Sequence, residues 1–418
     1  SPAPGGEAGG SSTGAVELNL WAFNIGGFTD ASNWDSIIAA FNEQNPDVKI
    51  TVTPINYQDG DQKLTNAITS GTGPDIIFEG PERIVGNYAR EGLMVDLSDL
   101  WEAGGADIPE GISSVSQLDG TYYMYPLSVA AHCMAINYEV FEAAGALQYI
   151  DEETRTWSTD DFVAAMEAIK TAIDNGTVSL ATPGIVYCGA QGGDQGTRAL
   201  VNNLYSDYYV NDDGTSYNAN SANNVKALTL LQEMVNEGSL SANASYAAAD
   251  ELQAFANQTC AVTFCWNYSN YTQYAEQTQF TPFAMAFPSD DSQPELEMAG
   301  PYGFGVFDKG DEAKIEAAKT FIDFVCNDQT VGTEAVKTTG FFPVHADWGD
   351  VYAGDADADL RAPFALMSDY LGRYYNLTGG WTEQRGYWWP MLAEIMTTGA
   401  DVQAAADNFV QQANANIG

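Results

Sequence analysis

The sequence predicts an α/β protein built as two lobes. Between residues 16 and 78, short apolar strands alternate with amphipathic helices, and a similar alternation restarts after residue 125. With 418 residues and 45% hydrophobic side chains, the chain can form more than one core. Strands and helices in alternation predict a mainly parallel sheet with flanking helices, so we expect one such sheet in each lobe.

The first strand-helix series is defined by hydrophobic spacing. Residues 16–23, VELNLWAF, alternate apolar and polar side chains, as a half-buried strand does. From Trp34 to Phe41, apolar residues recur at i, i+3, i+4 and i+7, which predicts a helix. Further strands are expected at 49–55 and 75–78, with a helical stretch between them.

The second series begins with CMAINY at residues 133–138. Ser158 and Asp161 have the spacing of a capping box, so a helix is expected to begin there. Further elements are predicted from apolar runs and periodicity: strands at 184–189, 260–266, 283–288 and 302–307, and helices around 225–235, 315–325 and 402–410.

Charge and composition exclude several classes of partner. The chain has 57 acidic and 15 basic residues, and the net charge of −42 repels nucleic acid and anionic membrane surfaces. Five scattered cysteines without a CxxC pair, together with only two histidines, predict neither a disulfide scaffold nor a zinc site. We therefore expect no cofactor, no metal and no nucleic acid.

The sequence carries no motif that identifies a catalytic site. GxSxG, HExxH, GxxxxGK[ST] and a complete GxGxxG are all missing. A glycosidase needs only two suitably spaced carboxylates, so a secreted glycoside hydrolase remains an alternative. The favoured interpretation is a binding protein that is not an enzyme.

Aromatic residues are concentrated at the expected ends of elements. They occur in YYMYP (122–126), WNYSNY (266–271), FFPVH (341–345) and WTEQRGYWW (381–389). A pyranose ring has apolar faces and a rim of hydroxyl groups, so its site combines aromatic planes with fixed polar groups. Because Pro390 suits the first position of a helix, residues 387–389 are expected on the loop that precedes it.

A charged loop follows the third strand, in GTGPDIIFEGPER (71–83). Ligands of parallel sheets bind beyond the carboxyl ends of the strands, so Glu79 and Arg83 are expected beside Asn24, which follows the first strand. The alternative is a surface ion pair between Arg83 and Glu79 or Glu82. For Trp266 and His132, at strand ends, core packing is the competing interpretation.

Several segments together resemble the extracytoplasmic sugar-binding proteins of bacterial ABC importers, the maltodextrin-binding group included. The resemblance is collinear from about residue 16 to 418 and rests on six segments: 71–83 with the following YAREGLMVDL, GTYYMYPLSVAAHCMAINYEVFEAAG, TWSTDDFVAAMEAIK, CAVTFCW, EAAKTFIDFVCND and the final amphipathic helix. It implies a periplasmic-binding-protein-like fold whose two discontinuous lobes are joined by a hinge. The three hinge crossings would lie near Tyr125, near 284–287 and near 340–343.

The resemblance also implies a ligand site and a partner. The loop with Glu79, Glu82 and Arg83 would bind sugar hydroxyls, and Trp266 would stack on a sugar ring. Position and composition add Gln191 and Asp194 in GAQGGDQG as polar contacts. The expected ligand-binding residues are Asn24, Phe28, Asp59, Asp61, Glu79, Glu82, Arg83, His132, Gln191, Asp194, Trp266, Asn267, Tyr302, Trp381, Tyr387 and Trp388.

The expected organisation follows from the same resemblance. Residues 1–14, rich in Pro, Gly and Ser, are predicted to be a flexible tether. Residues 15–124 with 286–340 would form lobe 1, and 125–285 with 341–418 would form lobe 2. The expected protein is a monomer, extracellular or periplasmic, held at the surface of a Gram-positive cell by an N-terminal lipid anchor. It would deliver an oligosaccharide to a transmembrane permease, or act as a glycan-binding protein without transport.

Overall fold

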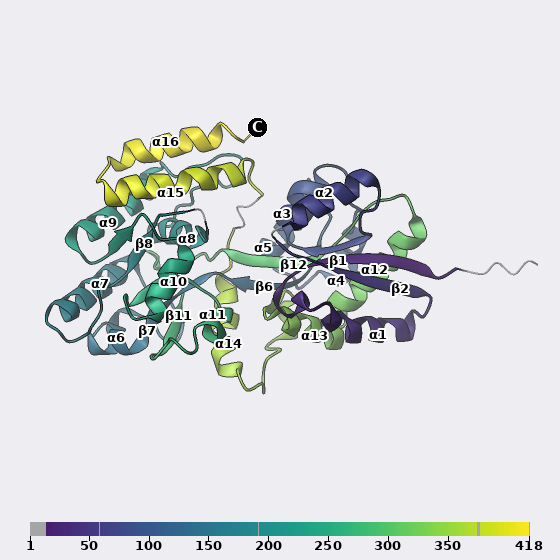
Figure 1. The fold of residues 1–418 in the computed structure, drawn as a ribbon, viewed down its shortest axis with the longest axis horizontal. Helices are drawn as coiled ribbons and strands as arrows, with labels where there is room; N and C mark the ends of the chain where they lie inside the picture. Colours follow the sequence, from purple (N-terminus) through teal and green to yellow (C-terminus); the bar gives the residue numbers. More distant parts are fainter. Residues whose placement is uncertain (1–13, 58, 191, 374–376, 418) are drawn as a thin grey trace, which may run out of the picture.

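The computed structural model describes residues 14–57, 59–190, 192–373 and 377–417. The expected tether therefore lies outside the described residues, apart from Gly14. Two lobes lie side by side along the long axis of the molecule, and strands pass between them (Figure 1). Each lobe has its own core of buried apolar side chains, so the two-lobe prediction from the repeated α/β pattern is confirmed.

Lobe 1 is built on a six-stranded sheet of order β13-β6-β12-β3-β1-β2. In β1 the alternate side chains of Leu18, Leu20 and Ala22 are buried, as the sequence pattern predicts. The elements of this lobe are β1 (Val16–Phe23), α1 (Asp35–Gln44), β2 (Val48–Ile55), α2 (Gly60–Ser70), β3 (Ile76–Glu79), α3 (Pro81–Arg83), a π-helix (Ile84–Ala89), α4 (Ser98–Gly104), α5 (Glu110–Val115), β4 (Gln117–Leu118), β5 (Thr121–Tyr122), α12 (Glu312–Asn327) and α13 (Gln329–Thr339).

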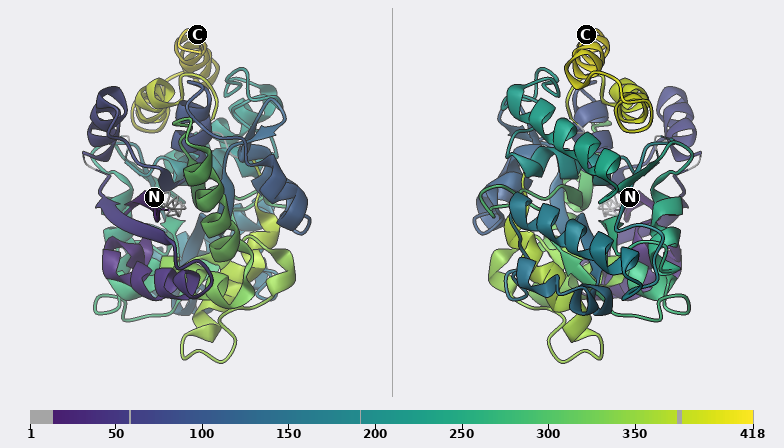
Figure 2. Two further views of the ribbon diagram at one scale, coloured as in Figure 1. Left: turned by 90° about the vertical axis from the view of Figure 1, so that its right-hand side faces the viewer. Right: turned by 90° about the vertical axis from the view of Figure 1, so that its left-hand side faces the viewer.

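Lobe 2 contains a three-stranded sheet of order β10-β7-β11 and a separate pair, β8 and β9. Helices α15 and α16 pack together at one end of this lobe, where Figures 1 and 2 show them in yellow. The elements are β7 (Cys133–Asn137), α6 (Tyr138–Ala143), α7 (Thr159–Asp174), β8 (Ile185–Tyr187), α8 (Gln195–Leu204), α9 (Ala222–Glu237), β9 (Ser241–Asn243), α10 (Ala248–Ala256), β10 (Val262–Trp266), α11 (Ser269–Gln273), β11 (Pro282–Met285), α14 (Ala358–Met367), α15 (Trp381–Thr397) and α16 (Val402–Asn414).

The expectation of mainly parallel sheets is correct for only part of the fold. In lobe 1, β1 pairs in parallel with β2 and with β3, but β12, β6 and β13 join antiparallel. In lobe 2, β7 pairs antiparallel with both neighbours, and only β8 and β9 are parallel. β12 reaches this sheet from lobe 2, whereas β6 and β13 leave it for lobe 2, so none of the three is joined to a neighbouring strand by the helical crossover of a parallel βαβ unit.

Three strands form the hinge: β6 (Tyr125–Ala131), β12 (Met298–Val306) and β13 (Phe342–Pro343). They are neighbours in the lobe 1 sheet, because β6 pairs with both others. Phe287 and Leu296 are buried in the lobe 2 core, whereas Met298 is buried in the lobe 1 core. We therefore place the second crossing near Glu297, later in the chain than the boundary expected at residue 286.

Candidate functional site

The lobe 1 wall of the site begins at the carboxyl end of β3. All four residues of this strand are buried, and Glu79 is the last of them. Gly80 is extended and Pro81 is the first residue of α3, so the chain turns directly from strand into helix. This turn places Glu82 and Arg83 beside Glu79 at the edge of the sheet, where the strand-end rule predicts a ligand site.

Arg83 organises this wall through two carboxylates. Its Nη1 donates to Glu79 Oε2 at 2.8 Å, while Nε and Nη2 donate to the two oxygens of Asp61 at 2.6 and 3.1 Å. Glu79 Oε1 also accepts from the Tyr57 hydroxyl at 3.1 Å and from the Gly80 N–H at 2.8 Å. The predicted pair of Arg83 and Glu79 is therefore formed, but with Glu79 buried rather than on the surface.

Burial sets the protonation behaviour of this wall. Burial raises the pKa of Glu79, although the charge of Arg83 acts to lower it. For Arg83, burial alone would lower the pKa, but the hydrogen bonds from its guanidinium to Asp61 and the charge of Glu79 raise it above its ordinary value. The pKa of Tyr57 is raised by burial and by Glu79. The Tyr57 hydroxyl is therefore neutral, and the residue as a whole is 45% exposed.

An inner cavity of about 200 Å³ lies between this wall and the hinge. On the opposite side are His132, after β6, and the backbone of residues 298–300 at the start of β12. Burial and the charge of Arg198 lower the pKa of His132 to about 4, so the imidazole is neutral at ordinary pH. A neutral imidazole offers one donor and one acceptor. The full lining of the inner cavity is Tyr57, Glu79, Gly80, Glu82, Arg83, His132, Met298, Ala299, Gly300 and Tyr302.

A second cavity, of about 320 Å³, lies in lobe 2 and shares His132 with the inner cavity. Trp266 and Asn267 line it where β10 ends, with Asn270 and Tyr274 from the segment that follows. Trp266 is only 1% exposed and belongs to the lobe 2 core, where its ring packs edge-on against Phe255 and Tyr271 at centroid distances of 5.7 and 5.2 Å. The ring therefore packs as a core residue does and offers no open face for stacking on a sugar. We call this space the lobe 2 cavity.

Two larger cavities continue the site between the lobes. The middle groove, about 480 Å³, runs between Asp61 and residues 82–90 of lobe 1 and residues 377–383 of lobe 2, and it shares Glu82 and Arg83 with the inner cavity. The outer groove, about 610 Å³, shares Arg90 and residues 377–379 with the middle groove.

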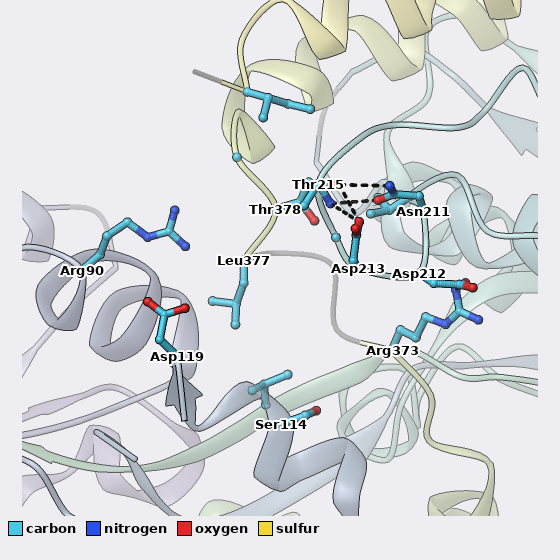
Figure 3. Close-up of a pocket in the computed structure, with 15 residues that line it drawn as sticks. Arg90, Ser114, Asp119, Asn211, Asp212, Asp213, Thr215, Arg373, Leu377 and Thr378 are labelled. Carbon is cyan, nitrogen blue, oxygen red and sulfur yellow. Dashed lines mark hydrogen bonds and ion pairs between the residues drawn. The ribbon is translucent and has the colours of Figure 1, made fainter. Parts of the chain in front are cut away.

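Figure 3 shows the two sides of the outer groove. Arg90 and Asp119 lie on the lobe 1 side, Asp213 and Arg373 lie on the lobe 2 side, and Leu377 lies between them. Shared lining residues therefore connect four cavities, from the lobe 2 cavity through the hinge to the outer rim.

Nine of the predicted site residues line these cavities. They are Asp61, Glu79, Glu82, Arg83, His132, Trp266, Asn267, Tyr302 and Trp381. The sequence reasoning missed Tyr57, Arg90 and the backbone of residues 298–300. Tyr57 follows β2 as Asn24 follows β1, so the same strand-end rule could have identified it.

Other predicted residues lie elsewhere. Phe28 is fully buried and stacks on Trp34 at 3.9 Å, so no face of its ring is open to a ligand. Asp59 is on the surface in an ion pair with Lys63 at 3.3 Å. Asn24 is half-buried and lines none of the four cavities.

The late aromatic cluster differs from the prediction. Helix α15 runs unbroken from Trp381 to Thr397 with Pro390 inside it, so residues 387–389 are helical and not on a lead-in loop. Trp388 is buried, and its Nε1 donates to Thr197 Oγ1 at 3.0 Å. Tyr387 is half-buried and accepts from Asn416 Nδ2 at 3.4 Å. Only Trp381, at the start of the helix, lines the cleft.

The two residues predicted from the glycine-rich loop cannot be treated alike. Gln191 lies outside the described residues. Asp194 is buried, and its carboxylate accepts from Arg198 and Arg385, so it lies behind the wall rather than on it.

Among the described residues, no group of three or more His, Cys, Asp or Glu side chains could hold a metal ion. No helix in the same ranges combines the length and apolarity needed to cross a membrane.

Comparison with known proteins identifies the family. Residues 36–363 match the family described as bacterial extracellular solute-binding protein. The chain belongs to this family. A binding protein of Brucella abortus is 25% identical over 366 residues, which cover 84% of this chain and 81% of the relative.

Solved structures confirm the two-lobe periplasmic-binding-protein fold. The sugar-binding protein MalE from Xanthomonas citri aligns with a TM-score of 0.76 at 16% identity, covering 96% of this chain and 97% of the other. The cyclic α-maltosyl-1,6-maltose binding protein from Arthrobacter globiformis aligns with a TM-score of 0.74 at 21% identity, covering 97% and 99%. At these identities the likeness concerns the fold alone.

Proposed function

We propose that this solute-binding protein binds an oligosaccharide in the cleft between its lobes and delivers it to the permease of an ABC importer. The observation that carries the proposal is the connected series of cavities from the lobe 2 cavity to the outer groove. Four cavities of about 200 to 610 Å³ that share lining residues suit a chain of several sugar rings better than a single small solute. A relative of the same fold is described as binding a cyclic maltosyl-maltose, which supports the sugar proposal.

The lining has the chemistry that a sugar needs. Tyr57, which is 45% exposed, offers aromatic surface, and Glu82, Arg83 and His132 offer hydrogen-bonding groups around it. Lobe 1 contributes the charged wall, and residues 377–383 of lobe 2 form the facing wall of the middle groove. A sugar in contact with both walls stabilises the closed form by its preference for that form over the open one.

Binding without catalysis is the favoured function. Two carboxylates of the cleft wall, Glu79 and Asp61, both accept hydrogen bonds from Arg83, which supports a structural role for them over acid and base catalysis. The alternative of a glycoside hydrolase predicts shortened products.

We further propose a monomer that acts outside the cytoplasm, tethered through its N-terminal end.

Isothermal titration calorimetry tests the proposal, with a panel of linear and cyclic α-glucans, chito-oligosaccharides and xylo-oligosaccharides. We expect at least one glycan to bind with micromolar or tighter affinity, about −8 kcal/mol or better. Each mixture is then separated by chromatography, and the bound sugar is expected to be intact. Millimolar binding throughout would contradict the proposal, and shortened sugar would favour the hydrolase.

A further inference from the structure

A cluster of four charged residues, three of them buried and Arg385 half-buried, lies behind the lobe 2 side of the cleft. Arg198, 4% exposed, donates through Nε and Nη2 to both oxygens of Glu297 at 2.8 and 3.0 Å. Its Nη1 donates to Asp194 Oδ2 at 2.7 Å. Arg385 donates to the same carboxylate, with Nη2 2.8 Å from Oδ1. Two guanidinium groups and two carboxylates thus balance each other in one connected cluster.

Three members of the cluster, Asp194, Glu297 and Arg385, are close in the chain to three different segments that line the cleft. Asp194 follows Gly192 and Gly193, which line the lobe 2 cavity. Glu297 precedes residues 298–300, which line the inner cavity, and its carbonyl oxygen accepts from the His132 N–H at 2.9 Å. Arg385 follows residues 381–383 on α15, which line the middle groove.

We propose that the cluster of Asp194, Arg198, Glu297 and Arg385 is a positioning element that sets the relative places of three wall segments for the bound sugar. The proposal rests on the proposed function of the cleft. The three segments are far apart in the sequence. Each one lies within two residues, along the chain, of a member of the cluster. The residues act through the backbone they hold rather than by touching the sugar.

The chemistry of the cluster suits positioning better than stability. Arginine presents a planar fork with fixed hydrogen-bond directions, so the bidentate contact of Arg198 with Glu297 fixes orientation as well as distance. Buried ion pairs contribute little net stability, because desolvation offsets their attraction, and well-packed apolar pairs often replace them without loss. Arg198 also stacks over Trp381, with Cζ 4.8 Å from the ring centroid, and so contacts the middle-groove wall directly.

A paired substitution tests the proposal in the protein without sugar. Arg198→Met combined with Glu297→Met removes one charge of each sign and leaves Asp194 paired with Arg385. We expect amide hydrogen exchange to accelerate at least tenfold in the segments 192–195, 298–300 and 381–383, while the urea midpoint of unfolding stays close to that of the wild type.

A matched control and a conservative variant separate geometry from charge. Lys309→Met with Asp75→Asn alters a cation paired at 3.1 Å with a buried carboxylate at the opposite end of β3, and it should leave exchange in all three segments unchanged. Arg198→Lys keeps the charge but loses the fork, so it should accelerate exchange to an intermediate extent. Wild-type exchange rates in Arg198→Lys, or in the paired variant, would overturn the proposal.

A titration adds the functional readout. The probe is the glycan of the calorimetric panel with the highest affinity for the wild-type protein, and we expect the paired variant to bind it at least tenfold more weakly. Unchanged affinity despite accelerated exchange would also overturn the positioning role. If no glycan binds the wild type, the proposed function fails, while the exchange experiment still decides whether the cluster holds the three segments.

Discussion

Replacing Arg83 by Met isolates the electrostatic contribution of the lobe 1 wall. The substitution keeps an apolar stem near the Phe23 ring, over which the guanidinium now lies at 4.7 Å, but it removes the cation that faces Glu79 and Asp61. Asp61 is exposed and returns to water at little cost. Glu79, with 4% of its side chain exposed, loses the one ion-pair partner that it has among the described residues.

The magnitude follows from the burial of Glu79. Removing one partner of a buried ion pair costs about 3–5 kcal/mol. Tyr57 and Gly80 still donate to the carboxylate, and Arg83 is partly exposed, so we expect the lower end of that range, about 3 kcal/mol. Glu79→Gln with Arg83→Met removes both charges and should cost only about 1 kcal/mol.

The pKa of Glu79 also predicts how the destabilisation caused by Arg83→Met changes with pH. Burial raises the folded-state pKa of Glu79, and loss of Arg83 raises it further, so the folded state of the variant holds its proton more tightly than the unfolded state. Stability is then lost as the pH rises from the unfolded pKa through the folded pKa. The destabilisation by Arg83→Met should therefore be smaller at pH 5 than at pH 8.

Urea unfolding of the wild type, the two single variants and the double variant at both pH values measures these differences. The coupling free energy of the double-mutant cycle should be about 2 kcal/mol at pH 8, increased by whatever Glu79→Gln costs alone. Equal losses for Arg83→Met and the double variant, or a loss independent of pH, would refute the assignment of a buried, charge-compensated Glu79.

Three further substitutions test other parts of the structure. Tyr57→Ala should weaken glycan affinity at least tenfold in calorimetry, about 1.4 kcal/mol, through lost ring contact; Tyr57→Phe, which keeps the ring, is the control and should lose less. Glu251 is buried without a basic partner and has a pKa raised to about 8, so its charge destabilises the fold as the pH rises from 4.5 to 8. Glu251→Gln should then stabilise by a few kcal/mol at pH 9 and by nothing below pH 4.5, and equal effects at both pH values would contradict this. Gly303→Ala should cost about 1–3 kcal/mol in thermal unfolding, because a Cβ there would lie 2.2 Å from the Tyr125 carbonyl oxygen on the neighbouring hinge strand; an unchanged midpoint would contradict the close pairing of β6 and β12.

Local sequence signals predicted individual elements well. The pattern at residues 16–23 gives β1 with the same bounds, and Ser158 caps α7 by accepting from the Asp161 N–H. Gly238 ends α9 in the left-handed conformation, which glycine adopts most readily. Each of these features is set by residues that are close to it in the chain, so a local sequence pattern is enough to predict it.

Features set by the tertiary fold were not predictable in the same way. The antiparallel joining of β12 to β3 depends on how the chain returns from the other lobe. The helical conformation through Pro390 depends on packing, since its local signal favours a helix start. Asp194 looked like a ligand contact because it follows glycines, but it pairs with Arg198 one helical turn later and with Arg385 on the distant helix α15. Strand-end charges at Glu79 to Arg83 were found because the rule for them concerns topology.

Hydrogen exchange with and without saturating glycan tests the central claim most directly. The claim is that one sugar contacts both walls of the cleft, so we expect slowed exchange in residues 79–90 of lobe 1 and, in the same sample, in residues 381–383 of lobe 2. Protection confined to one lobe, or located away from the four cavities, would contradict binding between the lobes.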